Sequence, residues 1–295
     1  MNRRDVLSLL GVGGVVFSSA LAGAAGKKVK SSSDSEFFFL QLSDTHWGYS
    51  GPANPAADVT LAAAVKTING VASRPDFIVF TGDLTHNTDD VAVRHQRMTE
   101  FDKIVSGLDV KQVRLMPGEH DASQDRGAAY QQHFGAPHYA FDHKGVHFVA
   151  LDNVSDPKGA VGADQIDWLA ARLKPLSRDA PIVVFTHRPL FDLYPQWEWA
   201  TADGAKVIDV LMPYRHVTVF YGHIHQEHHH QTEHIRHHAA RSLIFPLPAP
   251  GSAPRKAPIP WDAAAPYKGL GYRSVALDGR DSDPLLAEFP INRGP

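Results

Sequence analysis

Five short apolar segments, each followed by an acidic or imidazole side chain, constrain the fold of this chain more than any other feature. They are residues 38–43, 77–80, 113–116, 182–185 and 217–220. Segments of this length and composition predict buried β-strands. In one of them the apolar run stops abruptly at Gly82-Asp83. Packing does not require Asp, His or Glu after every strand, so the pattern predicts a ligand site at the carboxyl ends of the strands of an α/β sheet.

The side chains that follow these segments are the candidate site residues. They are Asp44, His46, Asp83, Glu119, His120, Asp121, His187, His223 and His225. Carboxylates and imidazoles that converge at one edge of a sheet indicate a metal centre, and Asp83 is expected at its middle. Asp44 and His46 are two residues apart, so in an extended segment both side chains point the same way. His223 and His225 share this spacing.

The composition of the chain limits the classes of protein to which it can belong and the kinds of metal site that it can form. The 295 residues, of which 43% are hydrophobic, are enough for a packed α/β core. The net charge is -3 without a long basic stripe, so nucleic acid is not expected as a partner. The chain has no cysteine, which excludes disulfides, zinc-thiolate sites and cysteine nucleophiles. Any metal must therefore be held by oxygen and imidazole nitrogen.

The first 26 residues have the features of an export signal. A pair of arginines precedes a mildly apolar stretch, and residues 20–22 offer a small-x-small cleavage site. The paired arginines resemble a twin-arginine signal, which predicts delivery to the periplasm by the export machinery and no membrane span after cleavage. An uncleaved membrane anchor stays open, because about 20 residues can span a bilayer. Residues 27–36 are expected to be a flexible linker and 37–295 the folded domain.

Between the five segments, spacing and capping signals predict further elements. Helices are expected at 61–68, from an N-cap at Thr88 to about Ser106, and at 166–173. Further strands are expected at 139–142, 146–152, 242–245, 272–277 and 285–289. Residues 189–201 carry four large aromatic side chains without periodicity. They predict a long loop that either lines a substrate cleft or covers the edge of the core.

Taken in order, the motifs resemble those of the calcineurin-like metallophosphoesterases. They are Asp44-x-His46, Gly82-Asp83, Gly118-x-His120-Asp121, His187 and Gly222-His223-x-His225. The resemblance implies an α/β fold, a four-layer α-β-β-α sandwich of two mixed β-sheets flanked by helices. It also implies a hydrolase acting on the phosphoric ester bond of a phosphodiester or phosphomonoester. The Asp-x-His start and Gln165-x-x-Trp168-Leu169 look most like the bacterial cyclic-nucleotide phosphodiesterases, so the small phosphoester could be a nucleotide.

The resemblance also implies a role for each motif residue. Two divalent or trivalent metal ions, Mn, Fe or Zn, would lie about 3.5–4 Å apart and activate a bridging water as hydroxide. The first would be held by Asp44, His46 and His225, the second by His187 and His223, and both by Asp83. His120 would act as the general acid and protonate the leaving oxygen, or stabilise its charge. Asp121 would orient His120.

Glu119 departs from the family, whose motif has Asn at this position. If its carboxylate still coordinates, the second metal is held more tightly but is a weaker Lewis acid, and the added charge repels phosphate. If it does not fit, the second metal site is weak or empty. A metal-binding protein with little or no turnover is therefore the alternative function. His120 and Asp121 favour the enzyme, because neither is needed to hold metal. A protein-serine/threonine phosphatase is disfavoured, since the loop after Asp83 lacks Arg-Gly.

Two further groups of residues have open roles. His86 and Asn87 are candidate substrate-binding residues, although His86 stands where purple acid phosphatases carry a metal-binding Tyr. Residues 223–238 contain eight of the 18 histidines. Apart from His223 and His225, these predict either a metal-gathering loop or an exposed polar hairpin.

Overall fold

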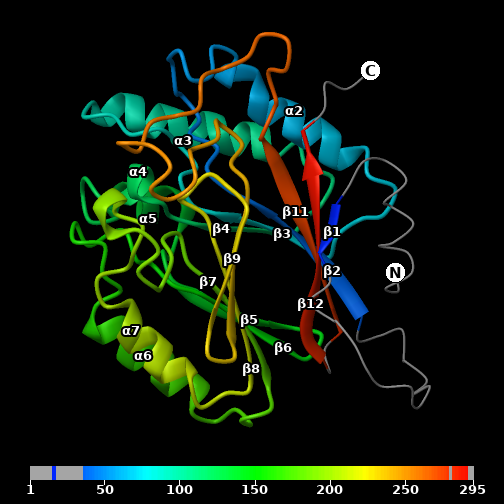
Figure 1. Ribbon diagram of the computed structural model, residues 1–295, viewed down its shortest axis with the longest axis vertical. Helices are drawn as coiled ribbons and strands as arrows, with labels where there is room; N and C mark the ends of the chain where they lie inside the picture. Colours follow the sequence, from blue (N-terminus) through cyan, green and yellow to red (C-terminus); the bar gives the residue numbers. More distant parts are fainter. Residues whose placement is uncertain (1–14, 18–35, 279–280, 292–295) are drawn as a thin grey trace.

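Strand and helix patterns along this chain fold into two six-stranded sheets with helices outside them. The computed structural model describes residues 15–17, 36–278 and 281–291 (Figure 1). The first sheet has the order β1-β12-β11-β2-β3-β4. Its strands are β1 (Val15–Phe17), β2 (Glu36–Leu42), β3 (Phe77–Thr81), β4 (Val113–Met116), β11 (Gly271–Asp278) and β12 (Asp281–Pro290). β2, β3 and β4 are parallel, whereas β1, β11 and β12 pair in antiparallel fashion, so the sheet is mixed.

The second sheet is also mixed and has the order β5-β6-β7-β8-β10-β9. Its strands are β5 (Tyr139–His143), β6 (Val146–Ala150), β7 (Pro181–Phe185), β8 (His216–Tyr221), β9 (His228–Thr232) and β10 (Ile235–Ala239). β6, β7, β8 and β10 are parallel, and the edge strands β5 and β9 are antiparallel to their neighbours. The carboxyl ends of parallel strands lie at one edge of the sheet, where ligand-binding sites of α/β proteins are usually found.

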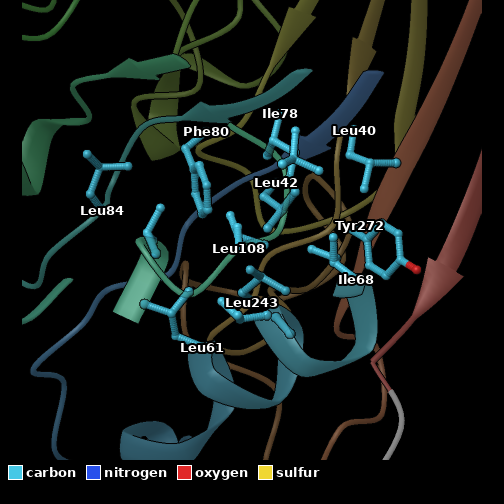
Figure 2. Close-up of a cluster of buried hydrophobic side chains, with 14 of the residues drawn as sticks. Leu40, Leu42, Leu61, Ile68, Ile78, Phe80, Leu84, Leu108, Leu243 and Tyr272 are labelled. Carbon is cyan, nitrogen blue, oxygen red and sulfur yellow. The ribbon is translucent and has the colours of Figure 1, made fainter. Parts of the chain in front are cut away.

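Three layers of apolar side chains join the sheets and helices. One lies between the first sheet and α2 (Ala57–Asn69) and α3 (Val91–Val105), and Figure 2 shows part of it, including Leu40 from β2 and Leu61 from α2. The second joins the facing sides of the two sheets through a cluster of phenylalanines. The third lies between the second sheet and α6 (Ala163–Leu173) and α7 (Gly204–Leu211). Three apolar layers separate four layers of structure, which confirms the expected sandwich.

The remaining elements are short. They are α4 (Glu119–Ala122), α5 (Ala128–Phe134) and the 3₁₀ turn η2 (Pro195–Trp197). Figure 1 shows α2 and α3 along one side of the sheets and α6 and α7 along the other. No helix within the described ranges is both long enough and apolar enough to cross a membrane.

Most of the expected elements are confirmed, and two details were wrong. Thr88 is not the N-cap of α3; Asp90 is, because its carboxylate accepts hydrogen bonds from the amides of Ala92 and Val93. Residues 242–245 do not form a strand, since the amide of Leu243 bonds to the loop after β2 instead.

The expected export signal and linker fall mainly outside the described residues. Within 1–26, only β1 is described, and it pairs with β12 at the edge of the first sheet. Within 27–36, only Glu36 is described, and it begins β2.

Candidate metal centre

The seven candidate metal ligands lie close together because loops from both sheets meet at one edge of the sandwich. They are Asp44, His46, Asp83, Glu119, His187, His223 and His225. Asp44, Asp83 and Glu119 follow β2, β3 and β4 of the first sheet, whereas His187 and His223 follow β7 and β8 of the second. Leu151, which follows β6, and Thr186 and Gly222, which follow β7 and β8, continue the backbone hydrogen bonding of the second sheet into this edge.

Five of the seven candidate ligands have a left-handed backbone. They are Asp44 (φ 55°), His46 (φ 42°), Asp83 (φ 49°), His223 (φ 66°) and His225 (φ 52°). Such a conformation costs about 1–3 kcal/mol for a non-glycine residue and persists only where the surroundings impose it, as at functional sites. Asp44 and His46 therefore do not point together because of an extended backbone, as the sequence suggested. Successive tight turns bring their side chains to the same place.

Two glycines allow the loops to approach closely enough. A Cβ on Gly118 would lie 2.1 Å from both the amide nitrogen and Oδ1 of Asp83. A Cβ on Gly222 would lie 2.0 Å from Oγ of Ser43. Any side chain at either position would push apart the loops that carry the candidate ligands.

The first group of candidate ligands is Asp44, His46, Asp83 and His225, all of them buried, with ligand atoms within 4.8 Å of one another. Nε2 of His46 lies 3.3 Å from Oδ2 of Asp83 and 3.2 Å from Nε2 of His225. Nε2 of His225 lies 3.4 Å from Oδ1 of Asp44. Nδ1 of His225 lies 2.8 Å from the carbonyl oxygen of Phe245, to which it donates, so its Nε2 is free to act as a ligand.

The second group is Glu119, His187 and His223. One carboxylate oxygen of Glu119 lies 2.8 Å from Nε2 of His187, and the other lies 2.8 Å from Nδ1 of His223. Each ring donates its other N–H to a backbone carbonyl: Nδ1 of His187 to Thr81 (2.7 Å), and Nε2 of His223 to Glu198 (3.3 Å). This fixes the tautomer that leaves a lone pair facing Glu119.

Orphaned atoms indicate that a metal ion fits the second group. Within the described residues, Oε2 of Glu119, Nε2 of His187 and Nδ1 of His223 are buried without a hydrogen bond of acceptable geometry. Three buried lone-pair donors that face one another are costly unless a cation satisfies them. The oxygen and nitrogen chemistry of both groups suits Zn, Mn or Fe.

Asp83 lies between the two groups. Its Oδ2 is 3.3 Å from Nε2 of His46 in the first group and 3.5 Å from Nε2 of His187 in the second. Its Oδ1 accepts a hydrogen bond of 2.9 Å from the amide of His120, which fixes the carboxylate. The structure therefore places Asp83 where a ligand shared by two metal ions would stand.

The ionisable side chains of the second group shift one another's pKa values in the direction that favours the charged forms of Glu119 and His187. Burial alone would raise the pKa of Glu119, but His223 and His187 hold it well below its usual value. Burial alone would lower the pKa of His187, but Asp83 and Glu119 hold it well above its usual value, so that without a metal ion a proton on Nε2 takes the place of the cation. Arg188 adds a further cation, with Nε 3.9 Å from Oε2 of Glu119. Glu119 is therefore ionised, and its charge is partly balanced by its neighbours.

The structure corrects the expected role of Asp121. Its buried carboxylate accepts hydrogen bonds of 2.8–2.9 Å from the amides of Leu84, Thr85 and Gly118 and from the hydroxyl of Thr85. It does not orient His120. It ties the loop after β3 to the start of α4, and so it supports Asp83 and Glu119 together.

His120 is oriented from the other side, by the backbone of Asn87. Nδ1 of His120 accepts a hydrogen bond of 3.3 Å from the amide of Asn87, which leaves the proton of a neutral imidazole on Nε2. The carbonyls of His86 and Asn87 accept hydrogen bonds of 2.7 and 3.0 Å from Nη1 of Arg97. Sequence reasoning missed Arg97, since no motif marks a side chain that acts through the backbone of another loop.

The structure brings His86 and Asn87 to the centre, but in different ways. Ligand atoms of His46, His86 and His120 gather within 4.8 Å, and Nδ1 of His86 lies 3.4 Å from Nδ1 of His46. Asn87 contributes its amide. The substrate-binding roles expected for this pair stay predictions.

The aromatic loop at residues 189–201 covers the core. Trp197 and Trp199 are buried in a cluster with Tyr221 and Ile224, so these rings do not line a cleft. Residues 228–239 form the β9–β10 hairpin. Within the parts of the chain that are described, no three ligand atoms of this hairpin gather closely enough to hold a metal. The hairpin is not simply exposed either, since His237 is fully buried.

Comparisons with known proteins agree with this geometry. The family model described as Calcineurin-like phosphoesterase matches residues 39–227. A probable cyclic nucleotide phosphodiesterase from Rhodococcus erythropolis is 27% identical over 199 residues, 64% of this chain and 64% of that protein. A probable glycerophosphodiester phosphodiesterase from Arcobacter nitrofigilis is 25% identical over 160 residues, 51% of this chain and 56% of that protein. The chain thus spans between about half and two thirds of these curated relatives.

Solved structures show the same fold at low sequence identity. A dimetal phosphatase from Danio rerio aligns with a TM-score of 0.56 and 13% identity, covering 87% of this chain and 98% of that one. A purple acid phosphatase from yellow lupin seeds aligns with a TM-score of 0.57 and 12% identity, covering 86% of this chain and 51% of that one.

Proposed function

Since the chain belongs to the calcineurin-like phosphoesterase family, we propose that it is a metal-dependent hydrolase of small phosphoric esters, with a phosphodiester as the favoured substrate. The observation that carries the proposal is the pair of buried ligand groups that share Asp83 and lie beside His120. The names of the two bacterial relatives, both phosphodiesterases, support the choice of a diester. A phosphomonoester is the second substrate to test.

Two metal ions would be held by the residues of the two groups. Asp44, His46 and His225 would hold one, Glu119, His187 and His223 the other, and Asp83 both. When bound, the ions would supply Lewis acidity and a nucleophile at neutral pH. With Glu119, three carboxylates instead of two would surround the metal ions. The net positive charge of the loaded site is then smaller, so its attraction for a phosphate anion is weaker. Arg188 lies on the side of Glu119 where it offsets this loss.

His120 would supply the proton for the leaving oxygen. In the neutral ring, the hydrogen bond from the amide of Asn87 to Nδ1 keeps the N–H on Nε2, where it would donate a hydrogen bond to the leaving oxygen and stabilise its charge. Full proton transfer would come from the imidazolium form, in which Nδ1 also carries a proton. A positioned acid of this kind is typically worth about 10²–10⁴-fold in rate. The loop after β3 and the start of α4 hold this geometry through the four hydrogen bonds of Asp121.

A metal-binding protein without turnover is the second candidate function. The observation in its favour is that both carboxylate oxygens of Glu119 lie 2.8 Å from an imidazole nitrogen. If both oxygens of Glu119 coordinate the second ion, they take up coordination positions that a substrate oxygen would otherwise use.

Hydrolysis of bis(4-nitrophenyl) phosphate after loading with Mn or Zn separates the two functions. If the protein is an enzyme, turnover should fall by about 10²-fold or more in His120→Ala while the metal content stays unchanged. His95→Ala on α3 is the matched control, because His95 belongs to neither ligand group. Absence of turnover in the metal-loaded wild type, with 4-nitrophenyl phosphate as well as with the diester, would leave only the binding function.

We further propose that residues 1–26 direct export to the periplasm and are then removed. The paired arginines, the mildly apolar stretch and the small-x-small site support this. Removal would also take away β1, an edge strand of the first sheet. Cell fractionation with N-terminal sequencing tests the proposal. A mature periplasmic protein is expected, and replacing both arginines by lysine should keep the protein in the cytoplasm. An intact N-terminus on the wild-type protein would contradict cleavage.

A further inference from the structure

A long proline-rich segment stands beside the metal centre. Between Ala239 at the end of β10 and Gly271 at the start of β11, the chain runs for 31 residues without helix or strand, drawn in orange in Figure 1. It contains seven of the 21 prolines and lies beyond the family match, which ends at residue 227. Segments of this length without secondary structure are uncommon in compact domains and usually functional. Prolines restrict the backbone, so such a segment can be preformed.

The start of this segment is fixed directly to the metal centre. The amide of Leu243 donates to the carbonyls of Ser43 (3.0 Å) and Asp44 (3.2 Å). The carbonyl of Phe245 accepts the hydrogen bond from His225 described above. Its ring lies 5.0 Å from the ring of His225 and 6.0 Å from that of His46, measured between centroids. Phe245 is therefore the wall of the centre on this side.

Phe245 also lines a cavity, so this one residue borders both the metal centre and the cavity. The cavity has a volume of about 340 Å³, and most of its lining is apolar. Its walls include Phe245, Pro246, Ile259, Trp261, Ala265 and Leu270. Two exposed residues of opposite charge, Asp262 and Lys268, also line it. Nε1 of Trp261 is buried and has no hydrogen-bond acceptor within the described residues.

We propose that this cavity binds one organic substituent of the phosphoester substrate, a planar aromatic ring. The inference rests on the proposed function, since it needs a phosphate at the metal centre. Its volume lies near the lower end of the range for small-molecule sites, which suits one or two rings rather than a peptide. Apolar walls that include the ring of Trp261 favour contact with the faces of an aromatic ring.

Two phosphonates test the subsite without depending on turnover. 2-Phenylethylphosphonate and ethylphosphonate carry the same phosphate-like group on the same two-carbon spacer and differ only in the ring. Their affinities for the metal-loaded full chain are measured by calorimetry. The wild type should bind the phenyl compound about tenfold more tightly, the lower end of what a hydrophobic pocket discriminates.

Variants locate the preference in the cavity. Ala265→Trp fills the cavity without deleting any group, and it should remove the preference while leaving the affinity for ethylphosphonate unchanged. Trp261→Ala should reduce the preference. Trp168→Ala is the matched control, since Trp168 is a partly buried tryptophan on α6 that does not line the cavity, and it should keep the tenfold ratio. Thermal unfolding confirms that each variant is folded.

Two results would overturn the inference in distinguishable ways. Equal affinity of the two compounds in the wild type, or a ratio that survives in folded Ala265→Trp, would overturn the subsite alone. Failure of both phosphonates to bind, together with no hydrolysis of either nitrophenyl ester, would overturn the proposed function and the subsite with it.

Discussion

Two regions of this molecule are rich in histidine, and they differ in almost every other respect. The metal centre gathers His46, His120, His187, His223 and His225 from four loops, with three carboxylates among them. The β9–β10 hairpin carries six further histidines within eleven residues, at positions 228, 229, 230, 234, 237 and 238. In the centre, nitrogen lone pairs face one another across a few ångströms. In the hairpin, Nδ1 of His229 and Nδ1 of His238 lie 2.7 Å apart, but among the described residues no third ligand atom joins them, because neighbouring strand residues point to opposite faces of the sheet.

The hairpin histidines also lack what makes the others ligands. His237 packs its ring 5.1 Å from that of Phe191, and both its nitrogens are buried without a partner in the described residues. Burial lowers the pKa of His237 to about 3 and, together with Arg273, that of His238 to about 2. These rings are therefore neutral packing groups. A candidate metal site therefore requires loops at strand ends that bring carboxylates together with histidines. A high density of histidines is not sufficient.

The largest expected contrast is between Asp83 and a hairpin histidine. Asp83→Ala removes the ligand that stands between both groups and should lower kcat/KM for bis(4-nitrophenyl) phosphate by about 10³-fold or more, since metal ions supply several kcal/mol of transition-state stabilisation. His230→Ala in the hairpin should leave kcat/KM within about twofold, because His230 stacks on Phe191 and belongs to neither ligand group. Metal-saturated assays of the two variants side by side measure this, and a comparable loss in His230→Ala would erase the contrast.

The second expected contrast is in stability against pH. An unfolded histidine titrates near pH 6.5, whereas folded His237 does so at about 3. The unfolded state therefore binds more protons below pH 6.5. The contribution of the neutral, buried His237 to the free energy of unfolding is fully present above pH 6.5 and is lost as the pH falls toward 3. Between pH 6.5 and pH 5 the loss should be about 2 kcal/mol for each such histidine.

Urea denaturation at pH 7 and pH 5 measures this loss in wild type and in His237→Phe. Part of the loss should disappear in the variant. An identical pH dependence in the two proteins would mean that His237 does not titrate as its burial requires.

Arg97→Met is expected to have a smaller effect, confined to the catalytic step. It frees the carbonyls of His86 and Asn87 and so loosens the amide that fixes His120. We expect kcat to fall by about tenfold, a part of the full contribution of a positioned acid, with KM and metal content unchanged. Esters with poor leaving groups should lose more than 4-nitrophenyl esters, because they depend more on protonation. Arg97→Lys should recover part of the rate. An equal loss for all leaving groups would indicate a structural defect only.

The smallest expected effect is a gain. His237→Phe replaces an unsatisfied buried imidazole by a ring of similar size, and should raise the free energy of unfolding at pH 7 by about 1 kcal/mol. The corresponding change at His187, His187→Phe, should destroy metal binding. If His237→Phe instead destabilises the protein strongly, the imidazole has a partner that packing does not explain.

Local composition predicted the strands and the convergence of the candidate ligands after them, whereas the four-layer sandwich was expected from the resemblance to the calcineurin-like family. The sequence did not predict what depends on contacts between distant loops. The left-handed turns at Asp44 and His46 replace the extended geometry expected from their spacing. The hydrogen bonds of Asp121 join two loops whose approach no sequence pattern reveals. Thr88 and Asp90 are both good caps, and only the path of the chain chooses between them.

Metal content, measured by elemental analysis on the purified protein after dialysis, shows whether the two ligand groups each hold an ion. Three proteins are compared: the wild type, Glu119→Asn, and a hairpin variant with His228, His229 and His230 replaced by alanine. We expect two equivalents in the wild type and in the hairpin variant, and weaker retention of the second ion in Glu119→Asn, which has lost a charged ligand. One equivalent or none in the wild type, or loss of metal in the hairpin variant, would contradict this expectation.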